Sequence, residues 1–290
     1  MPDLRVLRPG DEVDLDTFLA RHADTSMFLR ANARAAGLVD RGEPMQATYV
    51  AAVVDGRIRG VAAHCWNGMV LVQAPEHVAA VTREAVRHSR RAVTGFSGPW
   101  EQVVPARRAL DLEAAPAAKD SREELYVLDL ARLILPPALA GGQLRCCHPQ
   151  ESELEQLVEW RVQFALEALG AADGPELRRS SRADVLLHHQ RGSDWVLRAG
   201  PDLVSYSVFN AMLPEIVQIG GVWTPPELRR RGYARSVVAG SLLAARKQSV
   251  QRAVLFADPS NASARAAYLA LGFQIVGDYG LVLLRPPPTG

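Results

Sequence analysis

The 290-residue chain contains only three cysteines, Cys65, Cys146 and Cys147. Their number is odd, two of them are adjacent, and no C-x-x-C spacing is present, so the pattern predicts neither a disulfide framework nor a zinc site. We expect reduced thiols, which are typical of a cytoplasmic protein. His148 follows the cysteine pair, but three consecutive residues do not easily converge on one ion, and we expect no metal.

Long apolar runs are also lacking, and we expect no leader. The sequence begins MPDLRVLRPGDEVDLDTFLA, which has no apolar stretch behind a basic tip and does not predict a signal peptide. The longest apolar stretches, such as SVVAGSLLAA, have about half the length that crosses a bilayer. We therefore expect no membrane partner and a cytoplasmic location.

Neither sign of charge is in excess: the chain has 33 Lys and Arg and 32 Asp and Glu, which gives a net charge of +1. A protein whose main ligand is nucleic acid usually has a clear basic excess, so we expect no nucleic-acid partner. A hydrophobic content of 48% is typical of a soluble globular protein, and the length favours two domains. A monomer and a homodimer both fit the sequence.

A segment rich in proline and glycine, LPPALAGGQ (135–143), ends any helix or strand and suits a linker. We place one domain at 1–138 and a second at 142–290. Both domains have a similar order of predicted elements, which is an internal repeat of architecture rather than of sequence. The predicted fold class is α/β, with a mixed but mostly antiparallel sheet and flanking helices in each domain.

The second domain gives the clearer pattern. Apolar periodicity and turn signals predict strands at 143–149, 194–200, 202–213, 215–224 and 253–258, helices at 151–170, 174–192, 234–248 and 261–272, and a closing hairpin over 273–285. Gly220 and Gly221 lie inside the strand 215–224, where glycines indicate a bulge or a close backbone approach.

A strand-to-helix turn carries the segment PPELRRRGYA (225–234). The two prolines end the strand pairing, and the unpaired N–H groups at the following helix N-terminus form a site that suits a phosphate. Gly232 lets the phosphate approach the backbone, and Ala234 keeps the next position small. A solvated arginine turn explains the segment equally well on its own. Neither G-x-x-x-x-G-K-[ST] nor G-x-G-x-x-G is present.

Two motifs together resemble one family. Arg229-x-x-Gly232-x-Ala234 resembles the coenzyme A pyrophosphate loop of the GCN5-related N-acetyltransferases, which reads Gln/Arg-x-x-Gly-x-Gly/Ala. Downstream, NASARAAYLALGF (261–273) resembles the second signature of this family, an Asn followed by a Tyr and then Gly-Phe. The resemblance covers roughly residues 143 to 290, including the order of elements.

The paired layout also resembles tandem members of the family, such as glycine N-acyltransferase-like proteins and mycothiol synthase, in which one half has lost the motif. Here MVLVQAP (69–75) leads directly into EHVAAVTREAV, without an arginine-glycine loop. We therefore expect a family-like first domain without a coenzyme site, with an unrelated α/β domain as the alternative.

The resemblance implies an N-acetyltransferase that moves an acetyl group from acetyl-coenzyme A to a primary amine by direct attack in a ternary complex. The acceptor is a small molecule or a peptide. The resemblance assigns coenzyme binding to Val222, Trp223, Thr224, Arg229, Arg230, Arg231, Gly232, Tyr233, Ala234, Asn261 and Ala264. A backbone N–H near Val222 is the candidate oxyanion donor.

The resemblance also suggests the acid that protonates the leaving thiolate. Asn261 and Tyr268 are seven residues apart and so share one helix face. Asn261 can cap the helix and contact the pantetheine arm, which leaves the Tyr268 hydroxyl to point toward the sulfur. Without the resemblance, a core role for Tyr268 would be preferred. Some relatives carry a glutamate in the strand before the loop, and that position falls near Gln218, which cannot act as a base.

Glu215 is the carboxylate nearest to that position and therefore the candidate base. Alternatively, Glu215 is an ordinary exposed residue at the end of the strand, and the amine loses its proton to water. Since no clear base is present, a non-catalytic sensor or scaffold that binds acetyl-coenzyme A is the second hypothesis for the whole protein. Nucleic-acid binding through the three arginines is a third, and it predicts a steep salt dependence.

Overall fold

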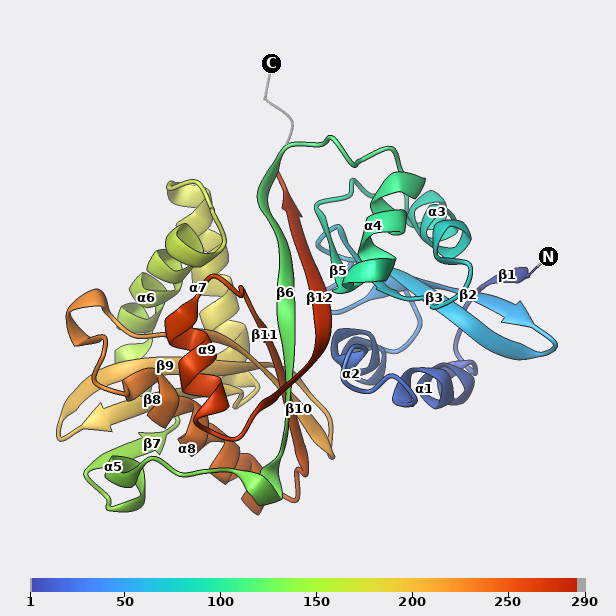
Figure 1. The fold of residues 1–290 in the computed structure, drawn as a ribbon. Coiled ribbons are helices and arrows are strands. Elements are labelled where there is room, and N and C mark those ends of the chain that lie inside the picture. Colours follow the sequence, from blue (N-terminus) through green and yellow to red (C-terminus); the bar gives the residue numbers. More distant parts are fainter. Residues whose placement is uncertain (1, 286–290) are drawn as a thin grey trace. The chain divides into compact units, whose positions relative to one another are not determined.

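The computed structural model describes residues 2–285 of the chain (Figure 1). It divides into two compact units. Unit 1 consists of residues up to Glu123 and of those from Asp278 onward, and unit 2 runs from Glu124 to Gly277. Each unit is an antiparallel sheet with one parallel strand pair and flanking helices, which is the predicted fold class.

Unit 1 begins with the first half of the chain. Its elements in order are β1 (Asp3–Val6), α1 (Glu12–Ala20), α2 (Met27–Ala36), β2 (Ala47–Val54), β3 (Arg57–Cys65), β4 (Met69–Gln73), α3 (Val78–Ser89), β5 (Gly95–Pro99) and α4 (Trp100–Ala109). The strands follow the order β1-β2-β3-β4-β5-β12, and β12 (Gln274–Leu284) comes from the end of the sequence.

Unit 2 contains the predicted second-half elements close to their predicted bounds. They are β7 (Leu144–Cys147), α6 (Leu154–Ala168), α7 (Pro175–Gln190), β8 (Asp194–Ala199), β9 (Asp202–Met212), β10 (Ile216–Trp223), α8 (Tyr233–Lys247), β11 (Arg252–Ala257) and α9 (Ala262–Leu269). Short helical turns are η1 (Leu130–Arg132), α5 (Pro137–Ala140), η2 (Glu151–Glu153) and η3 (Pro226–Leu228). The strand order is β6-β11-β10-β9-β8-β7.

The last strand of each half of the sequence completes the sheet of the other half. Residues 124–129 of β6 (Ala117–Asp129) pair antiparallel with β11 in unit 2. Residues 279–283 of β12 pair antiparallel with β5 in unit 1. The linker that we placed between 138 and 142 therefore lies inside unit 2 of this division.

The hairpin expected over 273–285 is wrong, because β12 is one continuous strand of eleven residues. The glycine at position 280, which suggested a turn, is required for another reason. A Cβ at this position would lie 2.9 Å from Val103 Cγ2 and 3.2 Å from Trp100 Cε3, both on α4. Gly280 thus permits a close approach of strand and helix rather than a turn.

Two apolar clusters cover the two faces of the sheet in unit 2. One contains buried residues of α8 and α9 together with Val217 and Ile219 of β10. The other contains buried residues of α6 and α7 together with Tyr206, Val208 and Trp223. The side chains of β10 therefore alternate between the two helical layers, as strand geometry requires.

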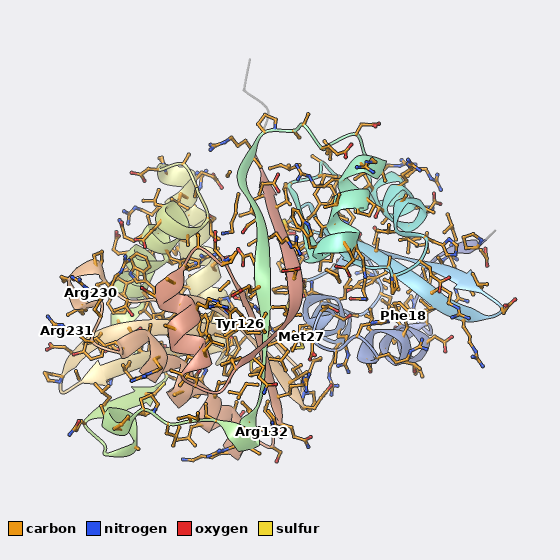
Figure 2. The ribbon with its side chains drawn as sticks, viewed as in Figure 1. Phe18, Met27, Tyr126, Arg132, Arg230 and Arg231 are labelled. Carbon is orange, nitrogen blue, oxygen red and sulfur yellow. The ribbon has the colours of Figure 1, made fainter. Side chains whose placement is uncertain are left out.

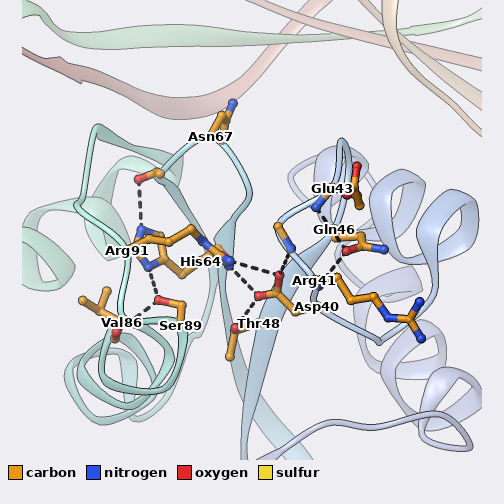
Figure 3. Close-up of polar contacts among 12 residues, drawn as sticks. Asp40, Arg41, Glu43, Gln46, Thr48, His64, Asn67, Val86, Ser89 and Arg91 are labelled. Carbon is orange, nitrogen blue, oxygen red and sulfur yellow. Dashed lines mark hydrogen bonds and ion pairs between the residues drawn. The ribbon is translucent and has the colours of Figure 1, made fainter.

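A polar network ties the segment after α2 to the end of α3 in unit 1 (Figure 3). Arg91 Nη1 donates to Asp40 Oδ1 at 3.0 Å, and Arg91 Nη2 donates to Asp40 Oδ2 and to the His64 carbonyl. Thr48 Oγ1 also donates to Asp40 Oδ2. Burial alone would raise the pKa of Asp40, but the hydrogen bonds from Arg91, Thr48 and Gly42 outweigh it and lower the pKa.

Candidate active site

Strands β10 and β11 pair only at their beginnings, where residues 216–218 run parallel to residues 252–254. Both strands continue, but within residues 2–285 no further pairing joins them. Their backbone edges part after Gln218 and are free to pair with something other than each other. An extended ligand can bind such an edge as an added strand does.

A bulge accounts for the parting of the strands. The register of β10 against β9 shifts after Gln218 and again between Gly220 and Trp223, where a bulge was predicted. Gly221 has φ of +56°, which favours glycine. A Cβ on Gly220 would lie 1.9 Å from Nδ2 of Asn210, so glycine is required there as well. Bulges re-aim the strand and end its pairing, which is their effect here.

The end of β10 is held rigidly. Trp223 and Thr224 are buried, and Ser205 Oγ donates to the Trp223 carbonyl at 2.9 Å and lies 2.9 Å from Thr224 Oγ1. Val222, at the bulge, packs against the cluster under α8. These contacts fix the direction in which the backbone leaves β10 and enters the arginine loop.

The predicted phosphate loop has the geometry of an anion site. Gly232 is the N-cap residue of α8 with φ of +78°, and Arg230 has φ of +64°. Within the part of the chain that the structure describes, no hydrogen bond reaches the N–H groups of residues 233–235. Left-handed residues in such a turn orient backbone N–H groups toward one point, and the helix dipole adds positive potential there.

The three loop arginines differ in their surroundings. Arg229 donates from Nε to the Thr224 carbonyl at 3.0 Å, pairs through Nη2 with Glu167 at 2.8 Å, and lies 4.8 Å over the ring of Trp223. Arg230 and Arg231 are exposed at the edge of unit 2 (Figure 2). Arg229 thus fixes the loop, and the other two are available to an anion.

The sequence pattern did not single out Arg235, which lies in the first turn of α8. Its Nε atom is buried without a partner among residues 2–285, and its Nη2 would be 3.8 Å from a Cβ on Gly232. The signal that could have found it is its place three residues after Gly232, on the turn whose N–H groups are free.

Asn261 begins α9 as predicted. Its Oδ1 accepts from the N–H of Ala264 at 3.0 Å, which is a normal helix cap. The cap occupies the Ala264 N–H, so Ala264 has only its partly buried side chain for contact with a ligand.

Tyr268 is 9% exposed and belongs to the core cluster under α8 and α9. Its ring lies edge-on to Tyr126 at 5.7 Å between centroids and to Phe273 at 6.0 Å. The Tyr126 hydroxyl donates to Glu124 Oε2, which also accepts from Arg265 Nε at 3.2 Å. The ring of Tyr268 is therefore fixed by Tyr126 on β6 and by Phe273, which follows α9, and its role as an acid stays a prediction.

Glu215 lies at the other end of β10 from the loop. It is exposed and precedes the strand, and its carbonyl accepts from the N–H groups of Gln251 and Arg252. Seven residues of strand separate it from Val222, which is about 20 Å at the usual rise per residue. The structure therefore does not bring Glu215 together with the bulge.

Gln218 occupies the position where β10 and β11 part. It is 2% exposed, its Nε2 donates to the Ile219 carbonyl at 2.7 Å, and its Oε1 has no partner among the described residues. The sequence indicated Gln218 only as the position near which some relatives carry a glutamate, and it predicted no role for the glutamine itself.

The corresponding turn of unit 1 has a different structure. It carries no arginine, and it folds back on β3 so closely that a Cβ on Gly60 would lie 2.3 Å from the Glu76 carbonyl oxygen. Gln102 of α4 accepts the N–H of Ala74 at 2.6 Å, and the Cβ position of Gly98 on β5 lies 2.4 Å from the Val72 carbonyl oxygen. The end of β4 is thus occupied by the unit's own residues.

Residues 2–285 include neither a cluster of metal ligands nor an apolar helix of spanning length. No group of three or more His, Cys, Asp or Glu side chains in this range is arranged to hold a metal ion. None of the helices in the same range has both the length and the apolar character that a bilayer-spanning segment needs.

Residues 154–273 match the model of the acetyltransferase (GNAT) family, where GNAT denotes the GCN5-related N-acetyltransferases. The matched segment begins with α6 and ends after α9, so it contains the bulge, the arginine loop and the Asn261 cap. No curated protein sequence is significantly similar to the chain.

Solved structures extend the likeness to the whole chain. A Drosophila protein aligns with 98% of this chain and 99% of its own at a TM-score of 0.67 and 11% identity. A GNAT from Kribbella flavida aligns over 93% and 96% at 0.58 and 16% identity. A tandem GNAT protein from the clavulanic acid biosynthesis pathway aligns over 100% of both chains at 0.52 and 14% identity.

These likenesses are likenesses of fold, and one of them is to a tandem GNAT protein over the full length of both chains. The GNAT family is therefore matched by residues 154–273, which contain both motifs, and the fold of the whole chain is that of tandem GNAT proteins.

Proposed function

We propose that the protein transfers an acetyl group from acetyl-coenzyme A to a primary amine of a small molecule or peptide. The observation that supports this most is the joint presence of an unpaired β10 edge and free helix N-terminal N–H groups in one continuous segment, residues 219–235. An elongated ligand with a pyrophosphate at one end and an amide-containing arm has the chemistry for such a segment.

Each residue group has a task in this proposal. The N–H groups of residues 233–235 and the guanidinium groups of Arg230 and Arg231 bind the pyrophosphate. The edge of β10 near Val222 pairs with the pantetheine arm and supplies an N–H to the thioester oxygen. Asn261 contacts the arm next to the cap of α9.

The transfer needs one new bond and one broken bond. The amine nitrogen attacks the thioester carbonyl carbon, the C–S bond breaks, and the thiolate takes a proton. Tyr268 is the proposed donor, because a phenol with a pKa of about 10 can protonate a thiolate of similar basicity. The amine loses its proton to water, since Glu215 is about 20 Å from Val222 along the strand.

Binding of the coenzyme is tested by titration calorimetry with acetyl-coenzyme A. We expect the wild type to bind and Gly232→Glu to lose binding, because the new carboxylate would both fill the loop and repel the pyrophosphate. Gly200→Glu is the matched control, since Gly200 has a similar φ of +62° and open space but lies in the turn after β8. It should bind as the wild type does.

If the wild type does not bind acetyl-coenzyme A, the proposal is contradicted, and the loop is better interpreted as a solvated arginine turn. Loss of binding in both glycine variants would instead indicate that backbone strain, not the site, causes the effect.

A coenzyme sensor is the second candidate, because the candidate base Glu215 lies at the other end of β10 from the bulge. Turnover separates it from an enzyme. Tyr268→Phe should retain acetyl-coenzyme A binding and lose about 100-fold in the rate of thiol release with an amine acceptor, the usual contribution of a general acid. An unchanged rate would remove Tyr268 from the mechanism. Binding without thiol release by the wild type would favour the sensor.

A further inference from the structure

Gln218 carries a buried hydrogen-bond acceptor that the protein itself leaves unused. Its side chain is one of the most buried polar groups of unit 2, with 2% exposure. Nε2 donates to the neighbouring Ile219 carbonyl at 2.7 Å, which fixes the amide and leaves Oε1 without a partner within residues 2–285. Buried polar atoms are nearly always paired, so an unpaired one needs a reason.

The place of Gln218 supplies that reason. It pairs with Val254 as the last residue that joins β10 to β11, so its side chain lies where the two strands begin to part. Val217 and Ile219 belong to the core under α8, and strand alternation puts Gln218 on the opposite face. The coenzyme loop begins at the α8 face, so Gln218 faces the other side of the sheet.

A second amide lies beside it. A Cβ on Gly220 would meet the side chain of Asn210 at 1.9 Å, so Asn210 packs across the bulge two residues after Gln218. The nearest carboxylate in β10 and its flanks is Glu215, which is exposed at the beginning of the strand. The bulge therefore offers neutral amide groups, and no charge from its own strand, to a molecule that approaches from this face.

We propose that Gln218 Oε1 accepts a hydrogen bond from the attacking amine and thereby positions it against the thioester. This inference rests on the proposed acetyl transfer and adds its amine site. A primary amine has an N–H to donate and a lone pair that must point elsewhere, so a single fixed acceptor orients the lone pair. Gln218 keeps its own protons throughout, because the amine proton leaves to water as the N–C bond forms and the C–S bond breaks.

Gln218→Met tests the proposal, because methionine has nearly the shape of glutamine but no amide. The probes are acetyl-coenzyme A and three primary amines: glucosamine, putrescine and a lysine-containing peptide. For any amine that the wild type acetylates, we expect kcat/KM to fall about tenfold or more, as for the loss of one hydrogen bond in a buried site. The dissociation constant of acetyl-coenzyme A should stay within about twofold of the wild-type value.

Thermal unfolding separates this role from a structural one. Gln218→Met removes the unpaired Oε1 at no cost to the fold and loses only the Nε2 hydrogen bond to the Ile219 carbonyl, so its melting temperature should fall no more than that of a glutamine whose Oε1 is paired. Gln102→Met is the matched control, since Gln102 is a buried glutamine of unit 1 whose Oε1 already accepts from Ala74. It should lower the melting temperature and leave kcat/KM unchanged.

Two outcomes would overturn the amine site. One is full kcat/KM in Gln218→Met, and the other is a wild type that binds acetyl-coenzyme A but acetylates none of the three amines. A wild type that does not bind acetyl-coenzyme A would overturn the proposed function itself, so the two failures are distinguishable.

Discussion

Arg229 holds the loop between β10 and α8 through three kinds of contact. One is a hydrogen bond to the Thr224 carbonyl, one is the stack on Trp223, and one is the ion pair with Glu167. Glu167 lies in the last turn of α6, where a carboxylate is unfavourable against the helix dipole. Its pairing with Arg229 offsets that cost and links α6 to the arginine loop.

Truncation of Arg229 should weaken coenzyme binding by disordering the loop, without removing a phosphate contact. We expect Arg229→Ala to raise the dissociation constant of acetyl-coenzyme A about tenfold, as when one side chain fails to pre-organise a site. Glu167→Gln should change it less than about threefold, because this pair is partly exposed and such pairs contribute little. Calorimetry measures both, and equal losses would show that the ion pair dominates.

The sequence could identify the arginine loop but not the division of roles within it. The local sequence and the resemblance predicted Gly232 at the start of α8, the cap at Asn261 and a bulge or close backbone approach at Gly220, because each depends on local backbone geometry. Glu167, the ion-pair partner of Arg229, lies 62 residues away in the sequence, on α6. No local pattern encodes such a contact. The unpaired Oε1 of Gln218 is likewise a property of packing.

At the scale of elements, the helices and strands of the second half were predictable, because apolar periodicity and turn residues mark nearly all of them. The exception is β12. Gly277 and Gly280 interrupt its apolar run and so predicted a turn, although Gly280 serves close packing against α4. Sequence does not distinguish a glycine needed for φ from one needed for space.

The segment after α2 depends on one carboxylate, Asp40, which receives hydrogen bonds from Arg91 and Thr48. Asp40→Asn should lower the free energy of unfolding at pH 7 by about 1 to 3 kcal/mol, through loss of charge-assisted hydrogen bonds. The pKa of Asp40 is lowered from 3.8 in the fold. Its contribution is therefore fully present above pH 3.8 and is lost as pH falls through the folded-state value.

Urea unfolding of the wild type and Asp40→Asn at pH 7 and at about pH 3 measures this dependence. The difference between the two proteins should shrink at the lower pH. A constant difference would show that the charge of Asp40 does not matter to the fold.

At the scale of the whole molecule, the two halves of the sequence are not the two units of the fold. Unit 2 needs residues 124–129 from before the proline-glycine segment, and unit 1 needs residues 279–283 from the end of the chain. A linker signal is local, whereas the partner of a strand is chosen by the entire sheet, so the sequence placed the boundary at 138–142.

Two fragments test this division. Fragment 124–277 contains all strands of unit 2 and should unfold in one cooperative transition by circular dichroism. Fragment 142–290 lacks residues 124–129, which leaves the β11 edge unpaired, and it carries β12 without its partner. We expect it to aggregate. Cooperative unfolding of 142–290 alone would contradict the division.

The exchanged strands also set the order of events during synthesis. The β5 edge emerges from the ribosome early, but its partner in β12 follows only after all of unit 2, residues 124–277, has been made. At about 5 to 20 residues per second, this delay is on the order of 8 to 30 s. For that time the nascent first half lacks the partner strand of β5, and an open sheet edge is a site at which chains associate.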